Sequence, residues 1–206
     1  MPGKRVAAIT ITFNRLELTK RTVDSFYSKT NVDYHLFIDN GSTDGTQEWI
    51  KQFDNIQLDK NYGIAYALAT AVNSIKDFDY ILKLDNDIET VTDDILNKML
   101  EFYEKAGDKY VCSPVDLLLD KNYAPPVLWK GNVSGFHVEH VSHTGGAFQL
   151  MPQKICRELC KDFRHLAKGD YMIGHFYRRK GYKPTYLKDL EMKHIGLNQS
   201  TPNYIL

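Results

Sequence analysis

The feature that most constrains the fold is an alternation of strand-like and helix-like segments through the first 115 residues. Short apolar runs rich in β-branched residues have the length of buried strands, and helical patterns with apolar residues every three or four positions separate them. The strand-like runs stand at residues 6–13, 34–39, 56–58, 80–84 and 110–115, and the most regular helical pattern spans residues 63–74. Strands that alternate with helices pair into a parallel sheet covered on both faces. The sequence therefore predicts a Rossmann-like α/β half.

The alternation of strand-like and helix-like segments ends after residue 115. Proline and glycine residues separate short strand-like pieces with the sequences VLWKGNV, FHVEHV and AFQLM. A helical pattern at 153–160, a basic stretch at 164–183 and a last strand at 185–195 follow. Because these pieces do not repeat the strand–helix unit, we expect residues 116–206 to share the core of residues 1–115, as two parts of one fused domain.

With 206 residues, the chain is long enough to bury a core without disulfide bonds or a structural metal. It has no run of 18 apolar residues, and its start, MPGKRVAAITITFNR, lacks the apolar region of a signal peptide. We therefore expect a cytoplasmic protein without a transmembrane segment. Three cysteines cannot all pair, which favours reduced thiols. Cys156 and Cys160 are spaced to share a metal ion, but buried thiols are the better interpretation because no second Cys or His pair has a zinc spacing.

Charge is divided unevenly along the chain, although the net charge is zero. Residues 1–120 hold 13 Lys and Arg against 20 Asp and Glu, and residues 121–206 hold 13 against 6. An acidic first part suits a divalent cation, and a basic second part suits an anionic partner. The alternative is solvated surface charge with no partner.

Polar side chains follow three of the predicted strands, at the point where each strand ends. Thr12 and Asn14 follow the first strand, residues 39–44 follow the second, and Asp85 and Asp87 follow the fourth. Ligands of open α/β sheets bind at the carboxyl ends of the strands. Two carboxylates at that edge can bind Mg²⁺ or Mn²⁺ together with phosphate oxygens, whereas the alternative for each acid is a turn or a helix cap.

Three ordered segments carry a family resemblance. FIDNGSTDGT, NYGIAYALATAVN and DYILKLDND, after an opening VAAITITFNR, are similar to glycosyltransferase family 2, whose members have the GT-A fold and use nucleotide-sugar donors. The resemblance is close over residues 6 to about 90. It implies an α/β fold with a GT-A, Rossmann-like mixed sheet flanked by helices. Residues 1–115 would bind the nucleotide sugar, and the smaller fused part at 116–206 would bind the acceptor and supply the catalytic base.

The resemblance also implies which residues bind the donor. Thr12, Asn14, Arg15 and Asp39 would hold the nucleoside, with Asp39 accepting a hydrogen bond from a pyrimidine N–H. Turn capping is the alternative for Asp39 and the preferred interpretation for Asp44. The other implied donor residues are Asn61 and Gly63 flanking the donor, Asp85 at the ribose or diphosphate, and Gly145 and Gly146 beneath the sugar.

Asp85 and Asp87 form an Asp-x-Asp pair that, by the same resemblance, would bind a metal ion, Mn²⁺ or Mg²⁺. A late histidine completes the metal shell in several GT-A enzymes, and His194 has the corresponding place near the end of the last strand. Imidazole suits Mn²⁺ better than Mg²⁺. The alternative for His194 is a satisfied polar residue on a strand. Three histidines stand at every third position from 137 to 143, but this spacing alternates the faces of a strand and does not favour a zinc site.

Asp170 is the candidate catalytic base. The family usually has an acidic pair that opens a helix, and the segment GDYMIGHFYRRKGYK matches it with Gly169 in place of the first acid and Asp170 as the second. Inverting sugar transfer needs a base within hydrogen-bond reach of the acceptor hydroxyl. Because Asp170 follows a glycine at a predicted helix start, it can face a cleft. The alternative is a helix N-cap.

The implied reaction is metal-dependent transfer, with inversion, of a sugar from a nucleotide sugar, such as UDP-glucose, to an acceptor hydroxyl. The acceptor would be a polysaccharide or DNA with hydroxylated bases. DNA is suggested by the basic stretch at 164–183, which can contact phosphates and is interrupted by aromatic residues that can stack on bases or sugars. A solvated helix face is the alternative for that stretch. The alternative functions are a sugar nucleotidyltransferase and a non-catalytic carbohydrate- or nucleotide-binding module. No GxGxxG or GxxxxGK[ST] motif supports a dehydrogenase or a P-loop enzyme.

Overall fold

The computed structural model describes residues 3–119, 122, 124–161 and 169–196. Its strands are β1 (Val6–Thr12), β2 (Tyr34–Asp39), β3 (Asp54–Gln57), β4 (Tyr80–Leu84), β5 (Ile88–Thr90), β6 (Tyr110–Asp116), β7 (Val127–Val133), β8 (Phe136–Val141), β9 (Phe148–Pro152) and β10 (Lys183–His194). Its helices are α1 (Leu16–Lys29), α2 (Thr46–Trp49), the short 3-10 helix η1 (Ile50–Gln52), α3 (Gly63–Ser74), α4 (Ile95–Ala106), α5 (Gln153–Cys160) and α7 (Asp170–Arg179).

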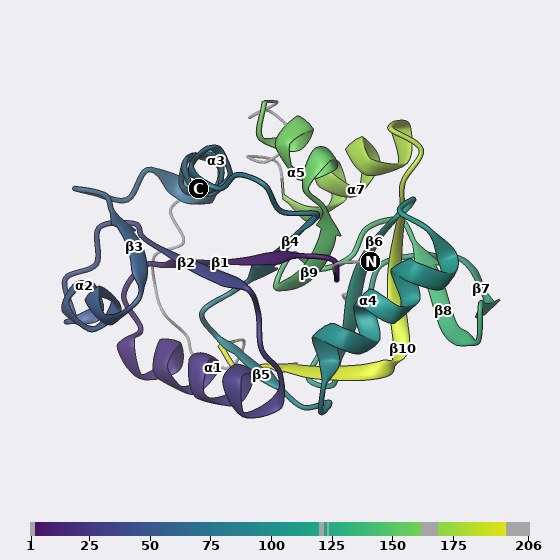
Figure 1. Cartoon of the computed structure of the whole chain (residues 1–206), viewed down its shortest axis with the longest axis horizontal. Helices are drawn as coiled ribbons and strands as arrows, with labels where there is room; N and C mark the ends of the chain where they lie inside the picture. Colours follow the sequence, from purple (N-terminus) through teal and green to yellow (C-terminus); the bar gives the residue numbers. More distant parts are fainter. Residues whose placement is uncertain (1–2, 120–121, 123, 162–168, 197–206) are drawn as a thin grey trace.

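All the described strands belong to one mixed sheet with the order β3-β2-β1-β4-β9-β6-β10-β8-β7, and β5 pairs with β10 (Figure 1). The first four strands of the chain are parallel, as the alternating pattern predicted. β9 then enters between β4 and β6 and runs antiparallel to both. The mixed α/β sheet implied by the family resemblance is therefore confirmed. Because β9 follows residue 115 in the chain, the sheet is continuous across the expected division, whose donor and acceptor roles stay predictions.

Helices cover the sheet on both faces, and each face has its own apolar cluster (Figure 1). Alternate residues of a strand point to opposite faces, so Leu82 and Leu84 of β4 pack with α1 and α4, whereas Ile81 packs with α3, α5 and α7. Lys83 follows the same alternation and shares the face of Ile81. The helix α3 begins and ends where the apolar period predicted it, at residues 63 and 74.

β5 is the strand that sequence analysis missed. It has only three residues, too few for a visible alternation, and its place depends on the antiparallel partner β10. In the register of that pair, His194 lies opposite Ile88, one residue after Asp87. The missed strand therefore brings the end of β10 next to the predicted acidic pair.

The three cysteines are buried free thiols, as expected. Cys156 and Cys160 both lie in the apolar cluster under α5. Within the described ranges, no three His, Cys, Asp or Glu side chains form a group ready to hold a metal ion, and this includes the histidines between 137 and 143. No helix in the described part of the chain is long and apolar enough to cross a membrane.

Candidate active site

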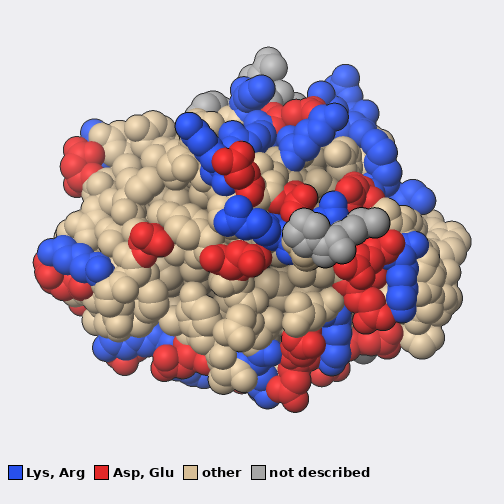
Figure 2. Space-filling view, viewed as in Figure 1, with Lys and Arg blue, Asp and Glu red and all other residues tan. Residues whose placement is uncertain are grey.

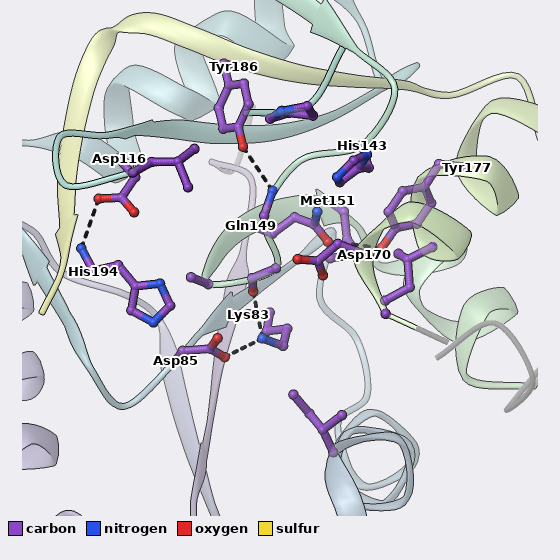
Figure 3. Close-up of a pocket in the computed structure, with 18 of the residues that line it drawn as sticks. Lys83, Asp85, Asp116, His143, Gln149, Met151, Asp170, Tyr177, Tyr186 and His194 are labelled. Carbon is purple, nitrogen blue, oxygen red and sulfur yellow. Dashed lines mark hydrogen bonds and ion pairs between the residues drawn. The ribbon is translucent and has the colours of Figure 1, made fainter. Parts of the chain in front are cut away.

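A cavity of about 480 Å³ opens at the rim of the sheet, on the face covered by α3, α5 and α7 (Figure 3). This volume is in the range of small-molecule sites. Residues from the end of β4, the loop before β9, the start of α7 and β10 line it, among them Asp85, Gly146, Asp170, Tyr186 and His194. The fold thus brings together acidic and basic groups that are up to 109 positions apart in the sequence.

The loops after β1 and β2 are tied to each other beside this cavity. Asn14 has a positive φ of 57°, its backbone N–H donates to Ser42 Oγ at 2.7 Å, and its side-chain oxygen accepts from the Thr43 N–H at 2.8 Å. Asp44 accepts hydrogen bonds from the first N–H of α1, on Leu16, and from Thr46 at the start of α2. Burial raises the pKa of Asp44, but these hydrogen bonds outweigh it and lower the pKa below its usual value. The capping interpretation of Asp44 is confirmed.

Asp39 ends β2 and is completely buried. One carboxylate oxygen accepts from Thr12 Oγ1 at 3.0 Å, and the other accepts from the backbone N–H groups of Gly41 and Ser42 at 3.0 and 2.8 Å. Gln47 adds a side-chain N–H at 3.1 Å. These contacts give Asp39 a structural role in shaping the loop, and its hydrogen bond with a pyrimidine N–H stays a prediction.

Asn61 and Gly63 lie at the start of α3. The side-chain oxygen of Asn61 accepts from Asn40 Nδ2 and from the Gly63 N–H, both at 2.8 Å. The loop after β2 approaches this segment so closely that a Cβ on Gly41 would lie 2.5 Å from the Cα of Lys60. Hydrogen bonds therefore connect the loops that carry the predicted donor residues. These residues are not among those that line the cavity itself.

Asp87 is almost completely buried and has two nitrogen-bearing partners. One carboxylate oxygen pairs with Arg15 Nη1 at 2.7 Å, and the other faces His194 Nε2 at 3.1 Å. Burial raises the pKa of Asp87, but the hydrogen bond with His194 and the charges of His194 and Arg15 lower it below its usual value. The pKa of His194 is raised, because its contacts with Asp87 outweigh its burial. Gly196 is required beside them, since any Cβ there would overlap the Asp87 carboxylate.

Asp85 has a different partner, Lys83, which sequence analysis did not single out. The Lys83 ammonium donates to the Asp85 carboxylate and to the carbonyl oxygen of Gly146, the latter at 2.7 Å (Figure 3). Burial raises the pKa of Asp85, and the Lys83 charge acts in the opposite direction. The available signal was a lysine inside YILKL, a strand that is otherwise apolar.

The residue types at the strand ends suit the metal ion that the resemblance implies, although the three side chains do not converge on one point in this structure. The carboxylates of Asp85 and Asp87 and the imidazole of His194 are oxygen and nitrogen ligands suited to Mn²⁺. Asp87 and His194 already face each other, whereas Asp85 is turned to Lys83. Asp116 holds the backbone at this point, because its carboxylate accepts the backbone N–H of His194 at 3.0 Å. Sequence analysis also missed Asp116, although it ends β6 as Asp39 ends β2.

Asp170 is the first residue of α7, is exposed, and lines the cavity. The helix N-cap is Gly169, with φ 77° and ψ −178°, a conformation that is essentially restricted to glycine. This backbone gives a physical reason for the glycine where the family usually has its first acid. Because Gly169 occupies the cap position, Asp170 does not serve as the N-cap.

Two glycines bring α7 and the loop before β9 together at the cavity. A Cβ on Gly146 would lie 3.1 Å from Asp170 Oδ1, so the carboxylate lies directly above bare backbone. A Cβ on Gly174 of α7 would overlap His143, so only glycine allows the helix to pack this close to the loop. The loop is also held by Tyr186, whose hydroxyl accepts the Gly145 N–H at 3.0 Å. Sequence analysis missed Tyr186, which is one of 13 tyrosines and stands in no motif.

Comparison with known proteins gives a consistent picture. The family model described as Glycosyl transferase family 2 matches residues 7–159. Among solved structures, the chain is similar to GalNAc-T7 with UDP, GalNAc and Mn²⁺, at a TM-score of 0.71 and 14% identity over 98% of this chain. It is similar to the mannosyltransferase PcManGT from Pyrobaculum calidifontis with GDP-Man and Mn²⁺, at a TM-score of 0.71 and 15% identity over 96% of this chain. It is also similar to S. aureus TarS 1-349 in complex with UDP, at a TM-score of 0.68 and 13% identity over 91% of this chain.

The chain covers 45%, 59% and 60% of these three structures, so it spans about half of their length. At these identities the likeness shows a shared GT-A fold and no more. No curated protein sequence matches this chain.

Proposed function

Because the chain belongs to glycosyl transferase family 2, we propose that it transfers a sugar, with inversion, from a nucleotide sugar to an acceptor hydroxyl. The observation that carries the proposal is the position of Asp170. Its carboxylate lies beside the bare backbone of Gly146, in a cavity of ligand size whose lining also includes Asp85 and His194. A base and the predicted diphosphate-binding acids thus share one cavity, which the proposed inversion requires.

In the proposed mechanism, Asp170 accepts the proton of the acceptor hydroxyl as that oxygen attacks the anomeric carbon. The bond from the anomeric carbon to the diphosphate breaks on the opposite face. Gly145 and Gly146 have no side chains of their own, so they let the sugar ring approach the backbone at the cavity. Holding donor and acceptor in one cavity supplies a large part of the remaining acceleration.

Asp87 and His194, with Asp85 on the cavity side, would hold the divalent ion. When bound, Mn²⁺ or Mg²⁺ supplies positive charge that stabilises the departing diphosphate. Arg15 keeps the Asp87 carboxylate in place through the 2.7 Å ion pair. The loops that carry Thr12, Asn14, Asp39, Asn61 and Gly63 would bind the nucleoside beside this site.

The donor is proposed to be a UDP-sugar such as UDP-glucose. Support comes from two of the similar structures, which hold UDP. PcManGT holds GDP-Man, so a guanine nucleotide is the alternative. A panel of nucleotide sugars therefore tests the proposal most directly.

We expect UDP-glucose with Mn²⁺, at about one hundred times its dissociation constant, to raise the melting temperature by about 5–10 °C, because a ligand of the native state stabilises it by mass action. The measurement is a thermal-shift panel of UDP- and GDP-sugars with Mn²⁺, with Mg²⁺ and with EDTA. Free glucose is the matched control and should give no shift. If no nucleotide sugar moves the melting temperature, the proposal is wrong. Slow release of UDP from UDP-glucose would separate an enzyme from a non-catalytic binding module.

The acceptor is proposed to be a polysaccharide, with DNA carrying hydroxylated bases as the alternative. Lys and Arg side chains gather over α5 and α7 (Figure 2). Arg179 and Lys180 are exposed at the end of α7, and Lys183 is exposed at the start of β10. Lys180 is paired with Glu158 at 2.9 Å, which reduces the positive charge of this surface. We also propose a cytoplasmic location, in keeping with three unpaired cysteines.

For the DNA alternative, we expect a gel shift with duplex DNA that weakens steeply between 50 and 200 mM salt, roughly in the range given by counterion release from phosphates. The unmodified duplex suffices, because phosphate contacts do not depend on the base. The control is the variant Lys105→Met, on α4. Absence of a shift at low salt would exclude a nucleic acid acceptor and leave the polysaccharide.

A further inference from the structure

Lys83 is the one charged residue of β4, and only 8% of its surface is exposed. It points to the same side as Ile81, where an apolar side chain would continue the core. Burying an ammonium group costs several kcal/mol unless it is paired and hydrogen-bonded. The ion pair with Asp85 and the hydrogen bond to the Gly146 carbonyl offset that cost. A leucine or isoleucine at this position would not incur it. A lysine in this place therefore indicates a role toward something in the cavity.

One N–H donor of the ammonium group is not used by the residues that the structure describes. Lysine carries three N–H donors, and two of those on Lys83 are used by the Asp85 carboxylate and the Gly146 carbonyl. In the described part of the chain, no third acceptor contacts the nitrogen. The side chain lines the cavity, so the remaining N–H is available to a ligand there.

Gly146 lies between Lys83 and Asp170 at the cavity. A Cβ on Gly146 would be 3.5 Å from Lys83 Nζ and 3.1 Å from Asp170 Oδ1. The two charged groups therefore flank one point above the glycine backbone, and Figure 3 shows them directed toward the same space. A ligand atom cannot occupy that point itself, because it lies one bond from the glycine Cα, but a hydroxyl in the cavity beside it can accept from the lysine. Sugars present hydroxyls of this kind on adjacent carbons.

We propose that Lys83 is a sugar-binding residue, which donates its third N–H to a hydroxyl of the transferred sugar, and that this sugar is uncharged. The proposal rests on the proposed function and names the class of sugar that the same site takes. Asp85 holds the ammonium in position and accepts from a neighbouring hydroxyl. Because Gly146 has no side chain, none at that position separates the lysine from the cavity.

The charge of the cavity carries the second part of the proposal. Its described lining holds three carboxylates, on Asp85, Asp116 and Asp170, and Lys83 is the only Lys or Arg among these residues. The diphosphate offsets the charge of the metal ion, His194 is paired with Asp87, and Asp85 offsets the lysine. Asp116 and Asp170 therefore leave carboxylates in excess around the sugar. A sugar with its own carboxylate would be repelled, and its binding would be disfavoured by like charge. Hexoses and N-acetylhexosamines meet no such penalty.

The test compares a nucleoside diphosphate with its sugar conjugate. Calorimetry with Mn²⁺ measures the dissociation constants of UDP, UDP-glucose and UDP-glucuronic acid, or of the corresponding series for the nucleotide that the thermal-shift panel selects. In Lys83→Met we expect the constant for UDP to stay within about twofold and that for UDP-glucose to rise about 10- to 100-fold, the effect of losing a hydrogen bond to a charged group. The wild type should bind UDP-glucose at least about tenfold more tightly than UDP-glucuronic acid.

Lys83→Met leaves the Asp85 carboxylate without its cation, so a second variant guards against misfolding. In Lys83→Gln, the amide N–H can still donate to Asp85, and the same selective loss is expected. Lys105→Met is the matched control, because Lys105 forms an exposed pair with Glu101 at 2.5 Å. Its binding constants should equal those of the wild type.

If the Lys83 variants lose affinity for UDP and for UDP-glucose by the same factor, the proposal is overturned, since Lys83 would then bind the diphosphate. Unchanged constants in folded Lys83→Gln would also overturn it and leave the lysine a structural role. If the wild type binds UDP-glucuronic acid more tightly than UDP-glucose, the inference that the transferred sugar is uncharged is wrong. If the wild type binds no nucleoside diphosphate at all, the proposed function itself fails, and that result differs from each of these.

Discussion

Replacing Asp170 by asparagine is expected to lower the rate of sugar transfer by about 10²- to 10⁴-fold, the usual contribution of a general base. The amide keeps the size of the side chain but cannot take the acceptor proton. Donor binding should stay within about twofold of the wild type, because the variant leaves the diphosphate edge and the Lys83–Asp85 pair unchanged. Steady-state transfer rates, with calorimetric titration of the nucleotide sugar, measure the two effects separately.

Asp189→Asn is the control for this experiment. Asp189 lies on the same β10 that lines the cavity, but its side chain is 57% exposed and contacts His137. Its replacement should leave both transfer and donor binding unchanged. If Asp170→Asn turns over at the wild-type rate, Asp170 is not the base. A parallel loss of donor binding would give Asp170 a binding role instead.

Replacing Asp87 by asparagine is expected to weaken Mn²⁺ binding and metal-dependent transfer by about 10- to 100-fold or more, as loss of a ligand or its close support does in metal sites. Asp87 is the acid on which Arg15 and His194 converge, at 2.7 and 3.1 Å. The amide cannot balance the guanidinium charge, so we also expect a lower melting temperature. Calorimetric titration with Mn²⁺, and thermal shift by UDP-glucose with and without Mn²⁺, measure these effects.

Glu89→Gln is the matched control, since Glu89 stands two residues further along and pairs with Arg21 and Lys193, both at 3.1 Å. It should bind Mn²⁺ like the wild type. Wild-type Mn²⁺ affinity in folded Asp87→Asn would remove Asp87 from the metal site. Loss of melting stability with unchanged metal affinity would leave it only the structural pairing with Arg15.

Sequence patterns predicted the limits of those helices and strands whose apolar pattern is complete within one segment. The strand at 80–84 and the helix at 63–74 have the expected limits, because an apolar run and a 3.6-residue period are each visible within one segment. The strand order was not visible in this way. β9 is as apolar as its neighbours, so nothing in its sequence says that it runs between β4 and β6. Such pairing depends on packing between distant segments.

The candidate site divides in the same manner. The acids at the strand ends, Asp39, Asp85 and Asp87, stood out because a polar group after an apolar strand is a local signal. The structure added what each of them contacts. Asp39 organises its own loop, and the two members of the Asp-x-Asp pair turn to different cations, Lys83 and Arg15.

The sequence by itself determined the family, the alternation of strands and helices, and the edge of the sheet at which the acids gather. Only the tertiary structure decided that Lys83, Gly146 and Asp170 enclose one space. These residues come from a strand, a loop and a helix, and no spacing along the chain relates them. Their meeting depends on β9 pairing with β4 and on α7 packing closely through Gly174, two contacts between surfaces that form only when the chain has folded.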